Sequence, residues 1–203
     1  MSTDSVDQPP TDTGDRTRQF LRLCLRARWE PAALQHARER AARHGVDCDA
    51  LIQLARSGGV AELLYHTVRG KDVVPPACEN ELRQDYFATA RRSLLAFNAL
   101  ERVLRSLSDV SASVPVIVLK GAALAEAVYG NPAVRPMGDV DLLVREADVP
   151  AALRALRALG YTVIPPRAYR CEVTLRPDSQ PATPPIELHW SLFVPFYYQQ
   201  QFS

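Results

Sequence analysis

A change of pattern at Val114 limits what this chain can fold into. Upstream, apolar residues recur at helical spacing, and glycine or proline separates one segment from the next. Downstream, the run VPVIVLK is continuous and β-branched, which is typical of a buried strand, and it leads directly into the alanine-rich helical stretch GAALAEAVY. The sequence therefore predicts an α+β protein, with a helical N-terminal part followed by a small β-sheet with flanking helices.

We expect three regions along the chain. Residues 1–16 are rich in Asp, Thr, Ser and Pro, and we predict that they form a disordered lead-in. Residues 17–108 are predicted to be helical and to end in the longest helix of the chain. Residues 109–203 are predicted to form an α/β domain, whose later strands are DVDLLV, YTVI, CEVTLR and IELHWSL.

Charge and hydropathy give no support for a nucleic-acid or membrane partner. The formal net charge is +1 and the isoelectric point about 7.7, so no overall field attracts nucleic acid or a membrane surface. The neutral charge therefore argues against a nucleic-acid-binding surface, and any anion must bind at a local site. The polar start of the chain does not resemble a signal peptide, and no later run reaches membrane-spanning length. These features predict a cytoplasmic protein without a membrane contact.

The four cysteines are scattered along the chain, at positions 24, 48, 78 and 171, and no C-x-x-C pair occurs among them. This spacing argues against a zinc site and against a disulfide framework. We predict reduced thiols that are mostly buried.

Two acidic residues, Asp139 and Asp141, alternate with apolar residues in the strand DVDLLV. Because side chains two apart on a strand point to the same face, these carboxylates lie about 7 Å apart along the chain. Two like charges on one face repel each other unless a cation lies between them, and Mg²⁺ prefers such oxygen ligands. Asp is also common in turns and helix caps, and the pair taken alone favours that simpler explanation.

Other residues favour a binding site. Lys120 and Gly121 occupy a strand-to-helix turn, where backbone N–H groups, the helix N-terminus and an amine could hold phosphate. Arg135, in the irregular segment before the acidic strand, could reach phosphate oxygens or could be a surface arginine. Glu187 is a lone acid in the apolar strand IELHW, where burial is costly unless a cation binds it. His189 shares a face with Glu187, and we expect it to be a hydrogen-bonded partner near the site.

The long motif LKGAALAEAVYGNPAVRPMGDVDLLV, followed by ALGYTV and IELHW, resembles a bacterial family of uncharacterised nucleotidyltransferases. That family is part of the nucleotidyltransferase superfamily related to DNA polymerase beta, and the resemblance spans about residues 60–192. It implies a nucleotidyltransferase fold around a small mixed β-sheet. It also implies that Asp139, Asp141 and Glu187 are the metal triad, and that Lys120 and Gly121 form the turn that binds nucleotide phosphate.

The activity implied by the resemblance is transfer of a nucleoside monophosphate from an NTP to an acceptor, with release of pyrophosphate and with Mg²⁺ or Mn²⁺ as cofactor. The motif leaves the acceptor open: a small molecule, a sugar, a peptide or protein, or an RNA end. The family association suggests a biosynthetic or cell-surface pathway.

Two departures from the family pattern keep an alternative open. The wider superfamily has Gly-Ser where this chain has Lys120-Gly121, and family members usually continue beyond the IELHW strand. We therefore expect this chain to lack the family's C-terminal part. The alternative is a non-catalytic module of the same fold that binds nucleotide or protein. In that case the aromatic segment FVPFYYQQQF, residues 193–202, would contact a protein partner.

Overall fold

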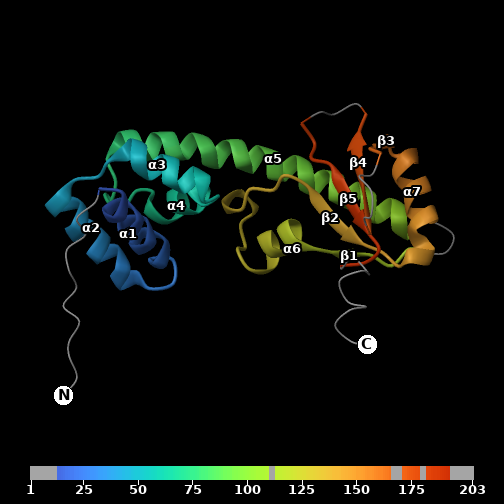
Figure 1. The fold of residues 1–203 in the computed structure, drawn as a ribbon, viewed down its shortest axis with the longest axis horizontal. Helices are drawn as coiled ribbons and strands as arrows, with labels where there is room; N and C mark the ends of the chain where they lie inside the picture. The colour runs from blue at the N-terminus through green and yellow to red at the C-terminus, as the bar shows by residue number, and fades with distance from the viewer. Residues whose placement is uncertain (1–12, 110–112, 166–170, 179–181, 193–203) are drawn as a thin grey trace, which may run out of the picture. The chain divides into compact units, whose positions relative to one another are not determined.

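The computed structural model describes residues 13–109, 113–165, 171–178 and 182–192. Its helices and small mixed sheet confirm the predicted α+β class (Figure 1). The chain forms two compact units, one ending at Phe87 and the other beginning at Ala88, so the boundary between them lies within α5 (Pro76–Ser108). The sequence places the domain boundary at residue 108, where this helix ends, and that division stays a prediction.

The first unit is built from short amphipathic helices: α1 (Thr13–Arg26), α2 (Pro31–His44), α3 (Cys48–Ser57), α4 (Ala61–Val68) and the first part of α5. Pro31 occupies the first turn of α2, and Gly45 ends that helix with a φ of +70°, a conformation that suits glycine. Apolar residues from all these helices form one core, with Leu51, Leu64 and Leu82 fully buried.

The prediction that residues 1–16 form a disordered lead-in is wrong for residues 13–16. Helix α1 begins at Thr13, and the Gln19 side chain donates a hydrogen bond to the Asp15 carboxylate at 3.0 Å. An acidic side chain in the first turn of a helix is stabilising, which accounts for the earlier start. Residues 1–12 lie outside the described part of the chain.

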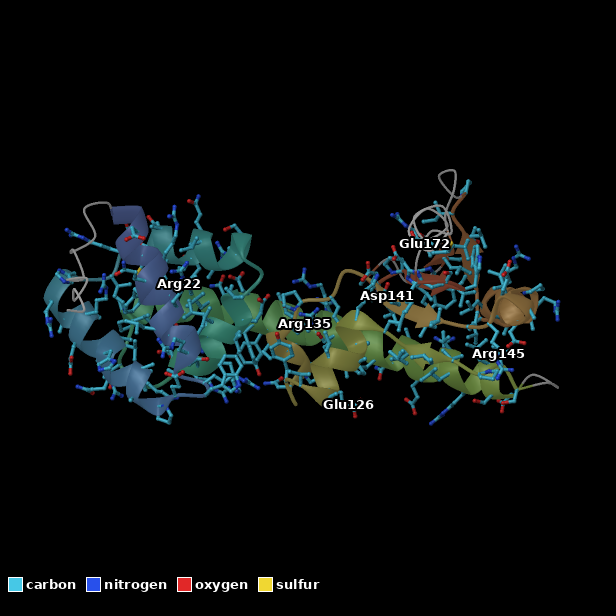
Figure 2. All side chains as sticks on the ribbon, turned by 60° about the horizontal axis from the view of Figure 1, so that its bottom comes forward. Arg22, Glu126, Arg135, Asp141, Arg145 and Glu172 are labelled. Carbon is cyan, nitrogen blue, oxygen red and sulfur yellow. A yellow bond between two sulfur atoms is a disulfide. The ribbon has the colours of Figure 1, made fainter. Side chains whose placement is uncertain are left out.

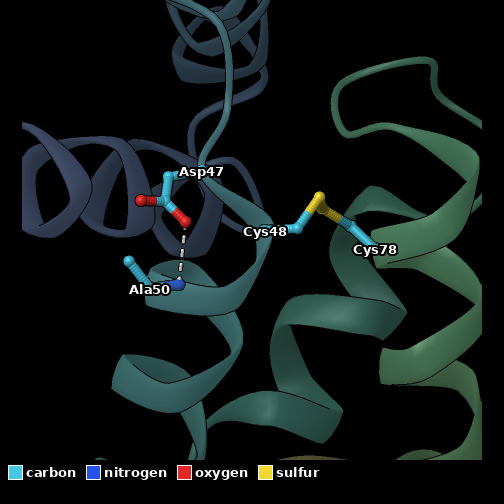
Figure 3. The surroundings of a disulfide bond; sticks show 4 residues. All are labelled: Asp47, Cys48, Ala50 and Cys78. Atoms are coloured by element: carbon cyan, nitrogen blue, oxygen red, sulfur yellow. Dashed lines mark hydrogen bonds between the residues drawn. A yellow bond between two sulfur atoms is a disulfide. The ribbon is translucent and has the colours of Figure 1, made fainter.

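The prediction that all four cysteines are reduced is wrong for two of them. Cys48, at the start of α3, and Cys78, in the first turn of α5, form a disulfide with their Cα atoms 5.4 Å apart (Figure 3). The start of α3 is fixed next to this bond, because the Asp47 side chain accepts a hydrogen bond from the Ala50 N–H. Cys24 and Cys171 are not part of this disulfide, and burial raises the pKa of the Cys24 thiol to about 12.

The second unit contains a five-stranded sheet in the order β1-β2-β5-β4-β3. The strands are β1 (Ile117–Val118), β2 (Val140–Leu143), β3 (Tyr161–Val163), β4 (Glu172–Pro177) and β5 (Ile186–His189). The central pair, β2 and β5, is parallel, and every other neighbouring pair is antiparallel. The sheet is therefore mixed, as predicted. Between the strands lie α6 (Lys120–Ala127), η1 (Pro132–Val134), η2 (Glu146–Asp148) and α7 (Val149–Ala158).

The apolar residues of the strands face the helices of the same unit. They pack with the later part of α5 and with α7 in one core, whose fully buried members include Leu142, Leu156, Leu175, Ile186 and Leu188. Because side chains alternate along a strand, this packing sends the intervening residues of β2, β4 and β5 to the other face. No helix among the described residues is long and apolar enough to cross a membrane.

Candidate metal centre

Strand register brings the acidic residues of β2 and β5 side by side. Asp141 is the direct partner of Glu187 in the parallel β2–β5 pair, although 46 positions separate them in the sequence. His189 is two residues beyond Glu187 on the same face of β5, and Glu172 of β4 is its direct partner. Asp141 and Glu172, labelled in Figure 2, thus come from the two strands on either side of β5.

His189 lies among three carboxylates. Its Nε2 is 2.9 Å from Asp141 Oδ1 and 3.7 Å from Glu187 Oε2, and its Nδ1 is 3.2 Å from Glu172 Oε2. Asp141 is only 2% exposed and His189 only 6%, so these polar groups interact largely out of solvent. The prediction that His189 is a hydrogen-bonded partner near the acidic residues is confirmed.

Lys120 approaches the same carboxylate from the solvent side. Its Nζ lies 2.6 Å from Asp141 Oδ1, while 60% of the lysine side chain is exposed. The hydrogen bond that Lys120 donates to Asp141 raises the pKa of the lysine, and the charges of Asp141, Glu187 and Asp139 add to this effect. The amine is therefore held in its charged form beside the acidic residues.

The backbone at Lys120 has a φ of +44°, which lies in the left-handed region that favours glycine. The hydrogen bond from the Leu119 N–H to the Asp141 carbonyl, at 2.9 Å, fixes the chain just before this residue. Gly121 serves a different purpose, because a Cβ there would lie 3.1 Å from Met137 Cγ. The turn is thus strained at the lysine and closely packed at the glycine.

Glu187 experiences the accumulated negative charge of this face. Burial raises its pKa, and the nearby carboxylates of Asp139, Glu172 and Asp141 raise it further, while His189 lowers it. Asp139 lies directly before β2 and acts on Glu187 through its charge. A bound cation would relieve this repulsion.

Three side chains meet the requirements of a metal site. One ligand atom each from Asp141, Glu187 and His189 can be chosen so that all lie within 4.8 Å of one another. Two carboxylate oxygens and an imidazole nitrogen form a donor set that suits a divalent cation, so these residues fit the ion that the family resemblance implies. Asp139, the third predicted ligand, is not in this group, and its metal role stays a prediction.

The other predicted residues are placed differently. The Arg135 guanidinium carbon lies 5.8 Å from the centre of the Tyr129 ring, and its Nε is buried without a hydrogen-bond partner within the described residues. Phosphate binding by Arg135 and by the turn at Lys120 and Gly121 stays a prediction. The aromatic segment at residues 193–202 lies outside the described part of the chain.

Sequence reasoning missed Glu172 altogether, and it did not consider His189 as a metal ligand. The signal for His189 was its spacing of two from Glu187 in IELHW. Glu172 had no comparable signal, because its position opposite His189 depends on how β4 pairs with β5.

A family model described as "Uncharacterised nucleotidyltransferase" matches residues 44–203, which is most of the chain. No curated protein and no solved structure matches this chain. The chain therefore belongs to this uncharacterised nucleotidyltransferase family, as the sequence motifs predict.

Proposed function

We propose that this member of the uncharacterised nucleotidyltransferase family transfers a nucleoside monophosphate from an NTP to an acceptor hydroxyl, with a divalent metal ion as cofactor. The observation that carries the proposal is the cluster of Asp141, Glu187 and His189, whose ligand atoms lie within 4.8 Å of one another. A nucleotidyltransferase needs such a cluster, because the triphosphate brings negative charge that must be neutralised.

In the proposed reaction, the acceptor oxygen attacks the α-phosphorus of the NTP. The bond between that phosphorus and the bridging oxygen of the β-phosphate breaks, and pyrophosphate leaves. The acceptor proton passes to the Glu187 carboxylate, a base whose pKa is raised by burial and by its acidic neighbours. A bound Mg²⁺ or Mn²⁺ would stabilise the attacking and leaving oxygens. Asp139, Asp141, Glu187 and His189 would supply its protein ligands.

Two cationic side chains are assigned to the leaving phosphates. The exposed Lys120 amine would leave Asp141 and bind phosphate oxygens instead. The first backbone N–H groups of α6, including that of Gly121, would bind the same phosphate. Leu119, the N-cap of α6, makes no side-chain cap hydrogen bond. Arg135, whose Nε has no partner within the described residues, would supply a second positive charge.

The location and the acceptor are also proposals. We place the reaction in the cytoplasm, with a small molecule, sugar, peptide or protein as the acceptor. The Cys48–Cys78 disulfide is unusual for that compartment, so the redox state of this pair in cells tests the proposed location. Full alkylation of both cysteines in rapidly quenched cells would agree with a reducing cytoplasm. Protection of both from alkylation would argue against it.

A second candidate function is nucleotide or protein binding without catalysis. One observation favours it: Lys120 Nζ lies 2.6 Å from Asp141 Oδ1, so an amine already neutralises the carboxylate that a metal ion would bind. Glu187 and His189 favour the catalytic proposal, because a lysine alone does not balance the charge of this face.

The test is incubation of the protein with Mg²⁺ or Mn²⁺ and each α-labelled NTP in turn, with release of pyrophosphate measured in parallel. The Asp139→Ala/Asp141→Ala double variant is the control. Label transfer or pyrophosphate release that the control lacks would support the enzyme. Saturable NTP binding without release would support the binding module. Absence of both would contradict the enzyme and the nucleotide-binding module.

A further inference from the structure

His189 is a buried ring whose two nitrogens both face carboxylate oxygens. Nε2 lies 2.9 Å from Asp141 Oδ1, and Nδ1 lies 3.2 Å from Glu172 Oε2. An oxygen that faces an imidazole lone pair is repelled, so each of these nitrogens must carry either a proton or a metal ion. The arrangement therefore calls for a proton or a metal ion on each ring nitrogen.

The sheet itself fixes this arrangement. Glu172 lies directly opposite His189 in the antiparallel β4–β5 pair, and Leu143 lies opposite His189 in the parallel β2–β5 pair. Directly opposed side chains have their Cβ atoms about 5 Å apart, within reach of a carboxylate and an imidazole. The contact between Glu172 and His189 is thus set by backbone pairing, and a metal ion is not needed to form it.

Asp141 and Glu172 compete for the single proton of the neutral ring, because each places a carboxylate oxygen beside one of its nitrogens. The Lys120 ammonium already pairs with Asp141 Oδ1, so Glu172 is the less neutralised acceptor. A carboxylate beside Nδ1 favours the proton on that nitrogen and fixes the orientation of the ring. The lone pair of Nε2 then points toward Asp141 and Glu187, whose oxygens lie 2.9 Å and 3.7 Å from it. In this tautomer, Nε2 becomes a nitrogen ligand placed between two oxygen ligands.

We propose that His189 is a metal ligand and that Glu172 is the positioning residue that orients it, so that the site prefers a first-row transition ion such as Mn²⁺ over Mg²⁺. Mg²⁺ takes oxygen ligands almost exclusively, whereas an imidazole nitrogen favours transition ions. This inference rests on the proposed function, because it places the ion in the same carboxylate cluster. It goes further by naming Glu172 as the residue that orients the His189 ligand and by stating which metal ions the site prefers.

The experiment uses the full chain and Mn²⁺ alone as the probe, without nucleotide. Electron spin echo envelope modulation of bound Mn²⁺ should show coupling to a directly ligated nitrogen, and His189→Gln should abolish that coupling. Glu172→Gln keeps the shape of the side chain and removes its charge. It should weaken Mn²⁺ binding by about 10- to 100-fold and weaken Mg²⁺ binding much less.

The matched control is Glu146→Gln, which neutralises an exposed carboxylate in η2, outside the cluster. It should leave both metal affinities unchanged. Thermal melting in EDTA verifies that each variant is folded, and for Glu172→Gln it separates a loss of metal binding from a loss of structure.

Two results would overturn the inference. Mn²⁺ bound without nitrogen coupling would show an all-oxygen site and would leave the proposed transfer reaction standing. An equal loss of Mn²⁺ and Mg²⁺ affinity in Glu172→Gln would remove the role of Glu172 in metal choice. Absence of any binding of either ion would also contradict the metal dependence of the proposed function, so the two failures are distinguishable.

Discussion

The two faces of the five-stranded sheet are built from alternate residues of the same strands, yet they differ completely in chemistry. On one face, Leu142, Leu188 and Ile186 are almost inaccessible and pack in the core with α5 and α7. On the other face, Asp141, Glu187 and His189 bring their ligand atoms within 4.8 Å. A shift of one residue in strand register would exchange the two faces.

This difference shows how the fold supports a costly site. Burial raises the pKa of Glu187, and repulsion between the clustered acids raises it further. The burial of apolar side chains on the opposite face, about 1.5–3 kcal/mol for each large one, holds the strands in place despite it. We therefore expect changes on the apolar face to alter stability and changes on the polar face to alter function.

The largest expected effect is functional. Asp141→Asn keeps the size of the side chain and removes a charge from the metal cluster, so we expect nucleotidyl transfer to fall by about 10³-fold or more, equivalent to about 4 kcal/mol. Pyrophosphate release under saturating NTP and metal measures this, with circular dichroism to verify folding. Full activity in a folded Asp141→Asn variant would contradict the expectation that changes on the polar face alter function.

The next effect concerns the apolar face. Leu188 follows Glu187 in β5 and is 0% exposed, so Leu188→Ala should lower the free energy of unfolding by about 3 kcal/mol. Urea denaturation measures the change. The control is Leu192→Ala, because Leu192 is 56% exposed and its truncation should change the free energy by less than about 0.5 kcal/mol. A similar loss of unfolding free energy in both variants would contradict the placement of Leu188 in the core.

A smaller effect is expected at the turn that joins β1 to α6. Lys120 has a φ of +44°, which glycine adopts without strain and alanine does not. Both Lys120→Gly and Lys120→Ala remove the amine, but the glycine variant should be more stable than the alanine variant by about 1 kcal/mol. Both should bind NTP more weakly than the wild type. Equal stability of the two variants would argue against a left-handed backbone here.

The smallest effect is a dependence of stability on pH. The pKa of Glu187 is raised by burial and by Asp139, Glu172 and Asp141, so the folded state binds its proton more tightly than the unfolded state does. Its contribution to stability is therefore present at low pH and is lost as pH rises through the folded-state pKa. In EDTA, the melting temperature of wild type relative to Glu187→Gln should fall as pH rises through that range. A rise of this relative melting temperature over the same pH range would contradict a raised pKa of Glu187.

Much of this arrangement was predictable from local pattern. The β-branched run before Lys120 and the alternation in DVDLLV and IELHW identify β1, β2 and β5, because strand periodicity is a local property. That alternation also places Asp141, Glu187 and His189 on the faces that the structure shows, once β2 and β5 are paired. The family motif could therefore be identified without coordinates.

Contacts between distant segments were not predictable in the same way. The Glu172–His189 contact depends on the register of β4 and β5, and the Cys48–Cys78 disulfide depends on the packing of two helices 30 positions apart. Neither pair has a distinctive spacing in the sequence. The left-handed backbone of Lys120 was also missed, because lysine rarely adopts that conformation and glycine follows it directly.

The central claim is that the polar face of the sheet binds a divalent metal ion. Crystals of the full chain with Mn²⁺ and a non-hydrolysable NTP analogue test it directly through anomalous scattering. We expect an anomalous peak in contact with Asp141, Glu187 and His189, with the analogue's phosphates against the Lys120 turn. A bound analogue with no peak at these carboxylates, and with Lys120 still paired to Asp141, would contradict it.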